Sequence, residues 1–356
     1  MTDIGKAIEI MDDLEVKQMI LQGPPGTSKT WSAMYEIVAT GIEYNKLISE
    51  LGTGTISLEK KRNIIKKAEE EIAEKDITKI EQLVKDYRIK EYTNETTDGE
   101  EIDVIRYWDM VQFHPSYGYE DFVRGITVTS DENNNIKYET LDKVFGNICK
   151  LAKPENNSNK KYFLIIDEIN RADIASVFGE LIYALENRGK QVTIPYALNG
   201  KDYSLTVPEN LYIIGTMNTA DKSIGNIDYA IRRRFLFFDC LPDEEVLKKY
   251  YKRENHFAIN SFNNIKNFIK ENLDEKYKEK DIQIGHTYFM IKSFKNEDEM
   301  KYKLQYQILP ILREYIDDGI LVKKKDDDNI CNKIFEYSKG KTEDFDIGDF
   351  FNLLKS

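Results

Sequence analysis

The sequence predicts an α/β protein with a parallel β-sheet core flanked by helices, plus a smaller helical domain. A short apolar segment at 18–22 leads through a glycine-bearing loop into a helical segment at 31–38. Two predominantly apolar segments, 162–166 and 211–217, each end in polar residues, as buried parallel strands do where they border a site. The sequence beyond Pro242 is lysine-rich and has apolar residues at helical spacing, which indicates a second domain.

The composition of the 356 residues limits the class of protein. Hydrophobic residues make up 41% of the chain, enough for a sizeable core. The net charge of −12 argues against coating of a DNA duplex through the overall field of the chain. The three cysteines are widely separated, which fits a reducing cytoplasm and gives no zinc site. No apolar run approaches the length of a membrane span, and the start lacks the layout of a signal peptide, so we expect a cytoplasmic protein without membrane contact.

The first elements predicted in chain order are a helix at 4–14, a strand at 18–22 and a helix that runs to about residue 43. Residues 45–100 then form a charged insertion. We favour two solvated helices within it, over a partner-docking or DNA-facing insertion. Their thin apolar stripe comprises Ile64, Ile65, Ala68, Ile72, Ile77, Ile80, Leu83 and Val84.

The remaining core elements alternate between strands and helices. We expect a strand at 104–113, an aromatic loop at 112–125, a strand at 162–168 and a helix at 174–187. Asn199-Gly200 predicts a hairpin, because both residues tolerate the positive φ that a tight turn requires. A strand at 211–217, a helix at 227–234 and a strand at 235–238 complete the core, and helices follow in 242–356.

The loop after the first strand has the composition of a phosphate-binding loop. In such loops, backbone N–H groups and the following helix N-terminus face an anion. Lys29 would reach the outer phosphates, and the Thr30 hydroxyl would hold Mg²⁺. Ser28 stands where a glycine is expected, and the alternative is a plain proline-glycine turn. The loop residues are Gly23, Pro24, Pro25, Gly26, Thr27, Ser28, Lys29 and Thr30.

Polar residues after the apolar strands complete a candidate hydrolytic site. Asp167 is placed to bind Mg²⁺, and Glu168 to position or deprotonate water; alone, such a pair would more often cap a helix. Asn218 could hold the attacking water or touch the γ-phosphate, or serve only as a turn residue. Asp221 and Lys222 follow in the same loop, where charge near a neighbouring subunit would be useful.

Three consecutive cations, Arg232, Arg233 and Arg234, end the helix at 227–234. They suit the helix dipole, and Asp228 lies four residues before Arg232, so a purely structural role is one reading. The other is an arginine finger that acts on the nucleotide of a neighbouring subunit, which requires a ring assembly.

Taken together, these motifs resemble the AAA+ module of the McrB family, the GTP-hydrolysing motor subunits of modification-dependent restriction systems. The resemblance rests on segments 113–117, 167–172, 217–221 and 232–235 and on a lid segment at 284–290. It covers about 15–44 and 104–315 and omits 45–100. It implies an AAA+ P-loop fold, with residues 1–241 as the nucleotide-binding domain and 242–356 as the helical lid.

The resemblance also implies roles and partners. Lys29 and Thr30 match the nucleotide-binding positions, Asp167 and Glu168 the Mg²⁺ and catalytic acids, Asn218 the sensor, and Arg232 and Arg233 the trans-acting arginines. His286 falls near the second sensor of the lid. Asp221 and Lys222 match the loop through which a McrC-type nuclease stimulates hydrolysis, although the family usually has Arg in place of Lys222.

The resemblance further implies Mg²⁺, GTP as the preferred substrate, a hexameric ring and a McrC-type nuclease partner. Only 22 residues precede Gly23, so we expect DNA recognition to lie in the partner or in a separate domain. No Asn-Lys-x-Asp guanine motif occurs, which leaves ATP open as the substrate. The alternatives are a MoxR-like ATPase that remodels proteins, and a nucleotide-gated scaffold with negligible turnover.

Overall fold

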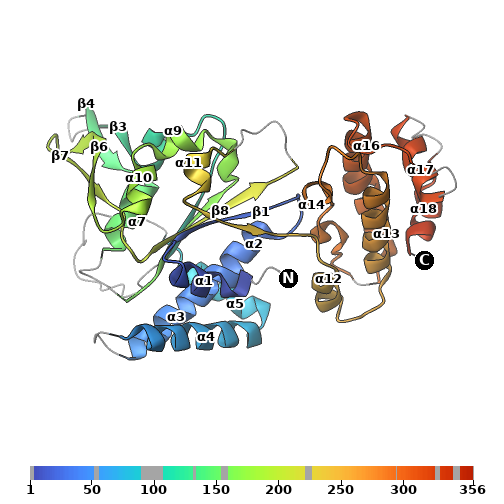
Figure 1. Cartoon of the computed structure of the whole chain (residues 1–356), viewed down its shortest axis with the longest axis horizontal. Helices are drawn as coiled ribbons and strands as arrows, with labels where there is room; N and C mark the ends of the chain where they lie inside the picture. Colours follow the sequence, from blue (N-terminus) through green and yellow to red (C-terminus); the bar gives the residue numbers. More distant parts are fainter. Residues whose placement is uncertain are drawn as a thin grey trace. The chain divides into compact units, whose positions relative to one another are not determined.

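The computed structural model describes residues 4–51, 56–89, 107–130, 134–153, 159–220, 227–293, 295–324, 329–339 and 345–355. The chain divides into two compact units. The first comprises residues 1–21, 30–217 and 222–238, and the second comprises 22–29, 218–221 and 239–356. The glycine-bearing loop at 22–29 therefore groups with the C-terminal helices. Figure 1 shows the elements of both units.

A five-stranded sheet forms the core of the first unit, and it confirms the predicted α/β fold class. Its strand order is β2-β5-β8-β1-β9. β2 pairs in parallel with β5, and β5 pairs in parallel with β8. β5 and β8 are apolar because helices cover the sheet, as the unbroken burial of residues 162–166 and 211–216 shows. The strands are β2 (Trp108–Gln112), β5 (Tyr162–Asp167), β8 (Leu211–Asn218), β1 (Gln18–Gly23) and β9 (Leu236–Asp239).

The first N-terminal helix lies within its predicted range of 4–14, whereas the helix after the loop extends beyond the predicted end near residue 43. After α1 (Ala7–Asp13), the helix that follows the loop begins as α2 (Lys29–Ser32). It passes through a π-helical segment (Ala33–Val38) and continues as α3 (Ala39–Glu50). α3 lies close against the sheet at Gly41, where a Cβ would come within 2.1 Å of the Phe163 ring.

The charged insertion contains the two expected helices, α4 (Leu58–Glu74) and α5 (Ile77–Asp86). Ser57 and Asp76 cap their N-termini through side-chain oxygens. The predicted apolar stripe is buried except for Ile77, which is 41% exposed at the first position of α5. The helix before the insertion, expected to end near residue 43, continues as α3 to Glu50, and the Asn45 side chain bonds the backbone of Lys161.

Two hairpins extend the first unit. The predicted one is β6 (Gln191–Leu198) and β7 (Asp202–Thr206), with φ of 50° and 68° at Asn199 and Gly200. The other, β3 (Arg124–Ser130) and β4 (Ile136–Asp142), was not predicted from the sequence. The buried Arg124 joins the two hairpins, because its guanidinium donates to the Asp142 carboxylate at 2.5 Å and to three backbone carbonyls of residues 196–204.

Short helices connect the strands of the first unit. The helix expected at 174–187 is interrupted, because Gly179 has φ of 48° and separates α9 (Ile174–Phe178) from α10 (Leu181–Glu186). The helix expected at 227–234 is shorter, α11 (Tyr229–Arg232). Two more are α6 (Tyr119–Phe122), which lies within the aromatic loop, and α7 (Val144–Leu151).

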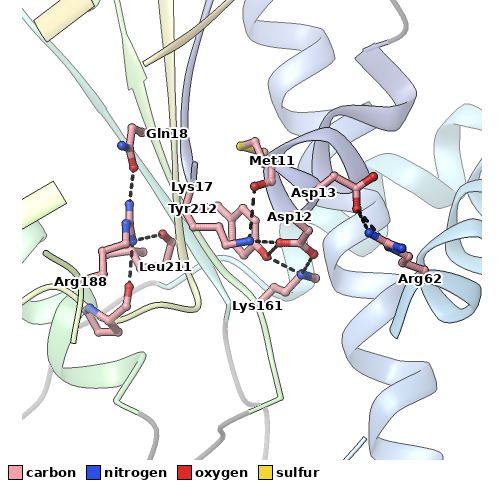
Figure 2. A network of polar contacts seen from close by, with 11 residues as sticks. Met11, Asp12, Asp13, Lys17, Gln18, Arg62, Lys161, Arg188, Leu211 and Tyr212 are labelled. Carbon is pink, nitrogen blue, oxygen red and sulfur yellow. Dashed lines mark hydrogen bonds and ion pairs between the residues drawn. The ribbon is translucent and has the colours of Figure 1, made fainter. Parts of the chain in front are cut away.

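A buried polar network joins α1 to the sheet (Figure 2). The Asp12 carboxylate accepts hydrogen bonds from Lys17, from Lys161 at 2.6 Å and from the Tyr212 hydroxyl. The Lys161 and Asp12 side chains are only 8% and 23% exposed. Burial lowers the pKa of Lys161 to about 8 in spite of the adjacent carboxylate. Burial opposes ionisation of Asp12 as well, but the charges of Lys161 and Lys17 lower its pKa below the ordinary value.

The second unit is helical. Its core contains Phe262, Phe289 and Leu309, all 1% exposed or less. Among the described residues, no helix is long and apolar enough to span a membrane. The helices are α12 (Glu244–Tyr251), α13 (Phe257–Asn272), α14 (Glu279–Ile282), α15 (Glu297–Lys303), α16 (Leu309–Asp317), α17 (Asn329–Ser338) and α18 (Ile347–Lys355), with a 3-10 turn at His286–Phe289 and a π-helical segment at Leu304–Ile308.

Candidate active site

In the first unit, a hydroxyl–carboxylate cluster lies at the carboxyl end of β5. Asp167 is the last residue of the strand, and its Oδ1 accepts hydrogen bonds from Thr30 Oγ1 at 2.7 Å and from Thr216 Oγ1 at 2.6 Å. Thr30 belongs to α2 and Thr216 to β8. Asp167 and Thr30 are thus in direct contact. Such proximity is required of two residues that are expected to bind the same metal ion. Thr216 was not predicted as a site residue, and its one signal in the sequence was its place two residues before Asn218.

Glu168 occupies a conformation that residues other than glycine rarely adopt. Its φ is 53°, in the left-handed region, and its backbone N–H donates to Thr216 Oγ1 at 3.1 Å. Its side chain forms an ion pair with Arg171, with 3.4 Å between Oε2 and Nε. Such a conformation costs on the order of 1–3 kcal/mol and persists where the surroundings enforce it, often at functional sites. The strained position therefore supports a functional role for Glu168.

The phosphate-loop residues of the second unit form a tight turn around the Lys29 ammonium group. Lys29 Nζ donates to the Gly23 carbonyl at 3.0 Å and to the Pro24 carbonyl at 2.8 Å. Thr27 Oγ1 also donates to the Pro24 carbonyl, at 3.0 Å. Gly26 has φ of 77°, which explains why glycine stands there.

Lid residues 284–288 contact this loop backbone to backbone within the second unit. The Gly285 N–H donates to the Pro25 carbonyl at 3.0 Å, and Thr287 donates to the Gly26 carbonyl from N at 3.1 Å and from Oγ1 at 3.0 Å. A Cβ on Gly285 would lie 2.0 Å from the Gly26 carbonyl group, so only glycine permits this approach. The lid segment therefore fixes the carbonyls of residues 25 and 26.

Ser28 and His286 make a side-chain contact across the same interface. Ser28 Oγ lies 2.9 Å from His286 Nε2, and Ser28 has φ of 60°. His286 is 3% exposed, and burial lowers its pKa to about 4 although Asp243 opposes the shift. The imidazole is therefore neutral at pH 7. The structure places His286 on the loop residue Ser28, which the sequence could not reveal.

The remaining candidates lie on β8 and near α11. Asn218 is the last residue of β8, which neighbours β5 as expected. Arg234 is buried and bonds Glu186 at 2.9 Å and the Ala230 carbonyl, so its role is structural. Arg232 and Arg233 are exposed, which keeps both available as trans-acting residues.

Contacts of the exposed arginines are weak. Arg232 lies over the Phe237 ring at 4.8 Å, and Arg233 Nε is 3.6 Å from Glu186. Asp228, considered as an ion-pair partner for Arg232, instead caps α11 by accepting the Ile231 N–H. Asp221 and Lys222 lie outside the described residues.

The donor chemistry at Thr30 and Asp167 fits Mg²⁺, which prefers oxygen ligands and keeps several waters and phosphate oxygens in its shell. One hydroxyl and one carboxylate, 2.7 Å apart, are the few protein ligands that such a site needs. Among the described residues, no group of three or more His, Cys, Asp or Glu side chains could form an all-protein metal cage.

Two protein-family models match the chain. An AAA domain of the dynein-related subfamily matches residues 104–235, and the McrB alpha-helical lid domain matches residues 259–320. The EcoKMcrB subunit of the type IV methyl-directed restriction enzyme of Escherichia coli K12 is 36% identical over 233 residues, which cover 61% of this chain and 49% of that protein. The chain carries a McrB-type AAA domain and a McrB-type lid domain.

A second relative is component YdiS of the type II restriction enzyme BsuMI of Bacillus subtilis 168. It is 30% identical over 177 residues, 44% of this chain and 51% of that protein. The chain thus spans about half the length of these two relatives. The solved structure of C. elegans PCH-2 is 14% identical, with coverage of 96% of this chain and 67% of that one and a TM-score of 0.31. The AAA domain and the similarity to McrB support a P-loop nucleotide hydrolase.

Proposed function

We propose that this chain is the ring-forming motor subunit of a McrBC-like DNA restriction complex, a GTP-preferring AAA+ triphosphatase that drives translocation and cleavage with a McrC-type nuclease. The cluster of Thr30, Asp167 and Glu168 supports hydrolytic activity, because a hydroxyl and a carboxylate of the kind that suits Mg²⁺ lie in contact next to a strained acid. The similarity to two restriction-enzyme components supports the restriction part. DNA would be bound by the partner or by a separate domain.

The residues have separate tasks in hydrolysis. Thr30 Oγ1 and the Asp167 carboxylate would hold Mg²⁺, which supplies positive charge next to the phosphates. Lys29 Nζ exchanges the carbonyls of Gly23 and Pro24 for phosphate oxygens when the nucleotide binds. Glu168 accepts a proton from water as the water oxygen bonds the γ-phosphorus. The bond from that phosphorus to the bridging oxygen breaks, and nucleoside diphosphate and phosphate result. Asn218 orients the water.

Arg232 and Arg233 would complete the site of the next subunit in the ring. Both are exposed on the first unit, whereas the adjacent Arg234 is held by Glu186. A guanidinium that reaches the γ-phosphate from a neighbour stabilises the charge that develops in the transition state, and such arginines contribute about 10³–10⁵-fold in rate.

Steady-state hydrolysis of GTP and of ATP tests the proposal. Glu168→Gln should lower kcat by about 10²-fold or more, because a general base contributes that much, while nucleotide still binds. Glu180→Gln, a change at an exposed carboxylate, is the matched control and should hydrolyse as the wild type does. A wild-type rate for Glu168→Gln would remove Glu168 from the mechanism. Preference for ATP in competition would favour the MoxR-like alternative.

A mixing experiment tests the ring. The double variant Arg232→Ala/Arg233→Ala keeps its own nucleotide loop, whereas Lys29→Ala keeps its arginines. Each should be inactive alone, and a mixture should regain activity through interfaces that combine an intact loop with intact arginines. Normal hydrolysis by the double variant would refute the trans-acting role. Light scattering with GTP measures the ring size, and added McrC-type nuclease should raise the rate.

A further inference from the structure

The contact between Ser28 and His286 has a defined donor and acceptor. His286 Nδ1 lies 3.3 Å from the backbone nitrogen of Asp243. A backbone N–H can only donate, so Nδ1 presents its lone pair, and the proton of the neutral ring resides on Nε2. Nε2, at 2.9 Å from Ser28 Oγ, is therefore the donor, and the serine oxygen is the acceptor.

This assignment leaves the hydrogen of the Ser28 hydroxyl directed away from His286. A hydroxyl has one hydrogen to donate as well as lone pairs to accept. Among the residues that the structure describes, the Ser28 hydroxyl makes its side-chain hydrogen bond with His286. Ser28 is half-buried and lies directly before Lys29, the residue expected to reach the phosphates.

The backbone at Ser28 supports a role for the side chain. With φ of 60°, this position favours glycine, the residue that phosphate loops usually carry here. A serine that adopts an unfavourable conformation, and whose oxygen contacts a buried histidine, points to a function for the hydroxyl.

We propose that the Ser28 hydroxyl donates a hydrogen bond to a phosphate oxygen of the bound nucleotide, and that His286 is the positioning residue that orients it. His286 then acts through Ser28 and does not touch the phosphates itself. The inference rests on the proposed nucleotide hydrolysis, and it assigns to the lid a part in recognising the triphosphate chain.

Equilibrium binding of fluorescent GTP and GDP tests this assignment. Ser28→Ala keeps the Cβ and removes the hydroxyl, whereas Ser28→Gly also relieves the backbone strain. Both should weaken binding on the order of tenfold or more, the usual contribution of a hydrogen bond to a charged group. His286→Leu removes the donor, and His286→Gln retains an N–H near the position of Nε2 and should recover much of the affinity.

The combination of variants separates positioning from a structural effect. If His286 acts through Ser28, His286→Leu should weaken nucleotide binding in the wild type but add little in the Ser28→Ala background. Equal weakening in both backgrounds would overturn the positioning role, and wild-type affinity of Ser28→Ala would overturn the phosphate contact. If His286→Leu does not fold, the two serine variants still decide the phosphate contact. Absence of binding by the wild-type protein would instead refute the proposed function.

Discussion

The network around Asp12 allows a quantitative prediction. Asp12→Asn removes the carboxylate that faces Lys161, whose side chain is 8% exposed. Loss of one partner of a buried ion pair destabilises a protein by about 3–5 kcal/mol. The cost of deprotonating Lys161 sets the upper limit of this destabilisation. With an unfolded-state pKa of about 10.4, loss of its proton at pH 7 costs about 5 kcal/mol, and Lys161 would deprotonate before the penalty grew further. We therefore expect the free energy of unfolding to fall by about 3–5 kcal/mol at pH 7.

The pH dependence follows from the same numbers. The folded-state pKa of Lys161, about 8, lies below its unfolded-state value. Between pH 8 and about 10.4 the unfolded state therefore binds more protons than the folded state, so the free energy of unfolding rises with pH. The free-energy penalty for burying the charged Lys161 is present in full below pH 8 and is relieved as the pH rises above 8. At pH 9 the wild-type Lys161 is mostly neutral, so the difference between wild type and Asp12→Asn should narrow by about 1 kcal/mol.

Urea denaturation followed by tryptophan fluorescence measures the effect, because both tryptophans, Trp31 and Trp108, belong to the first unit. Asp13→Asn is the matched control. Asp13 lies next in sequence, and its exposed ion pair with Arg62, at 2.7 Å, should contribute less than about 1 kcal/mol. The double variant Asp12→Leu/Lys161→Met should recover most of the free energy of unfolding that Asp12→Asn loses. Equal effects of Asp12→Asn and Asp13→Asn, or a larger difference at pH 9, would refute the reasoning.

Three further predictions concern single positions. Glu168→Gly should raise the free energy of unfolding by about 1 kcal/mol, because glycine relieves the positive φ, yet abolish hydrolysis; unchanged stability in urea would argue against strain. Gly41→Ala should destabilise by about 1–3 kcal/mol through its clash with Phe163, and Phe163→Leu should partly rescue it in the same assay. An NMR titration should show His286 neutral from pH 8 to about 5, because its folded pKa of about 4 lies below the ordinary value. Because the unfolded-state histidine binds its proton near pH 6.5, the free energy of unfolding should fall as the pH drops from about 6.5 to about 4, and a native-state titration near pH 6.5 would contradict the effect of burial.

The sequence allowed prediction of the sheet because its central strands are continuous apolar runs with polar ends. β5 and β8 were expected close to their observed bounds, and their adjacency brings Asp167 and Thr216 into contact. The acid pair and the glycine-bearing loop could be recognised as candidates because each motif is contiguous in the chain.

The missed features depend on contacts that a local pattern does not encode. The β3–β4 hairpin exposes apolar residues such as Val128 and Tyr138, at 61% and 72%, so it lacks the contrast between a buried and a solvated face. The partner of His286 is Ser28, which lies more than 250 positions away in the chain. The positive φ of Gly179 separates α9 from α10, although the residues on both sides of it have the pattern of one continuous helix.

The backbone contacts between the loop and residues 285–287 have a consequence for synthesis of the chain. A nascent chain that has emerged to residue 241 already contains Lys29 and Thr30, but it lacks the donors that hold the carbonyls of residues 25 and 26. The phosphate loop, encoded near the start, can therefore reach its final geometry only after the lid segment has left the ribosome. We expect the first unit to fold without help from bound nucleotide, and nucleotide binding to mark completion of the second.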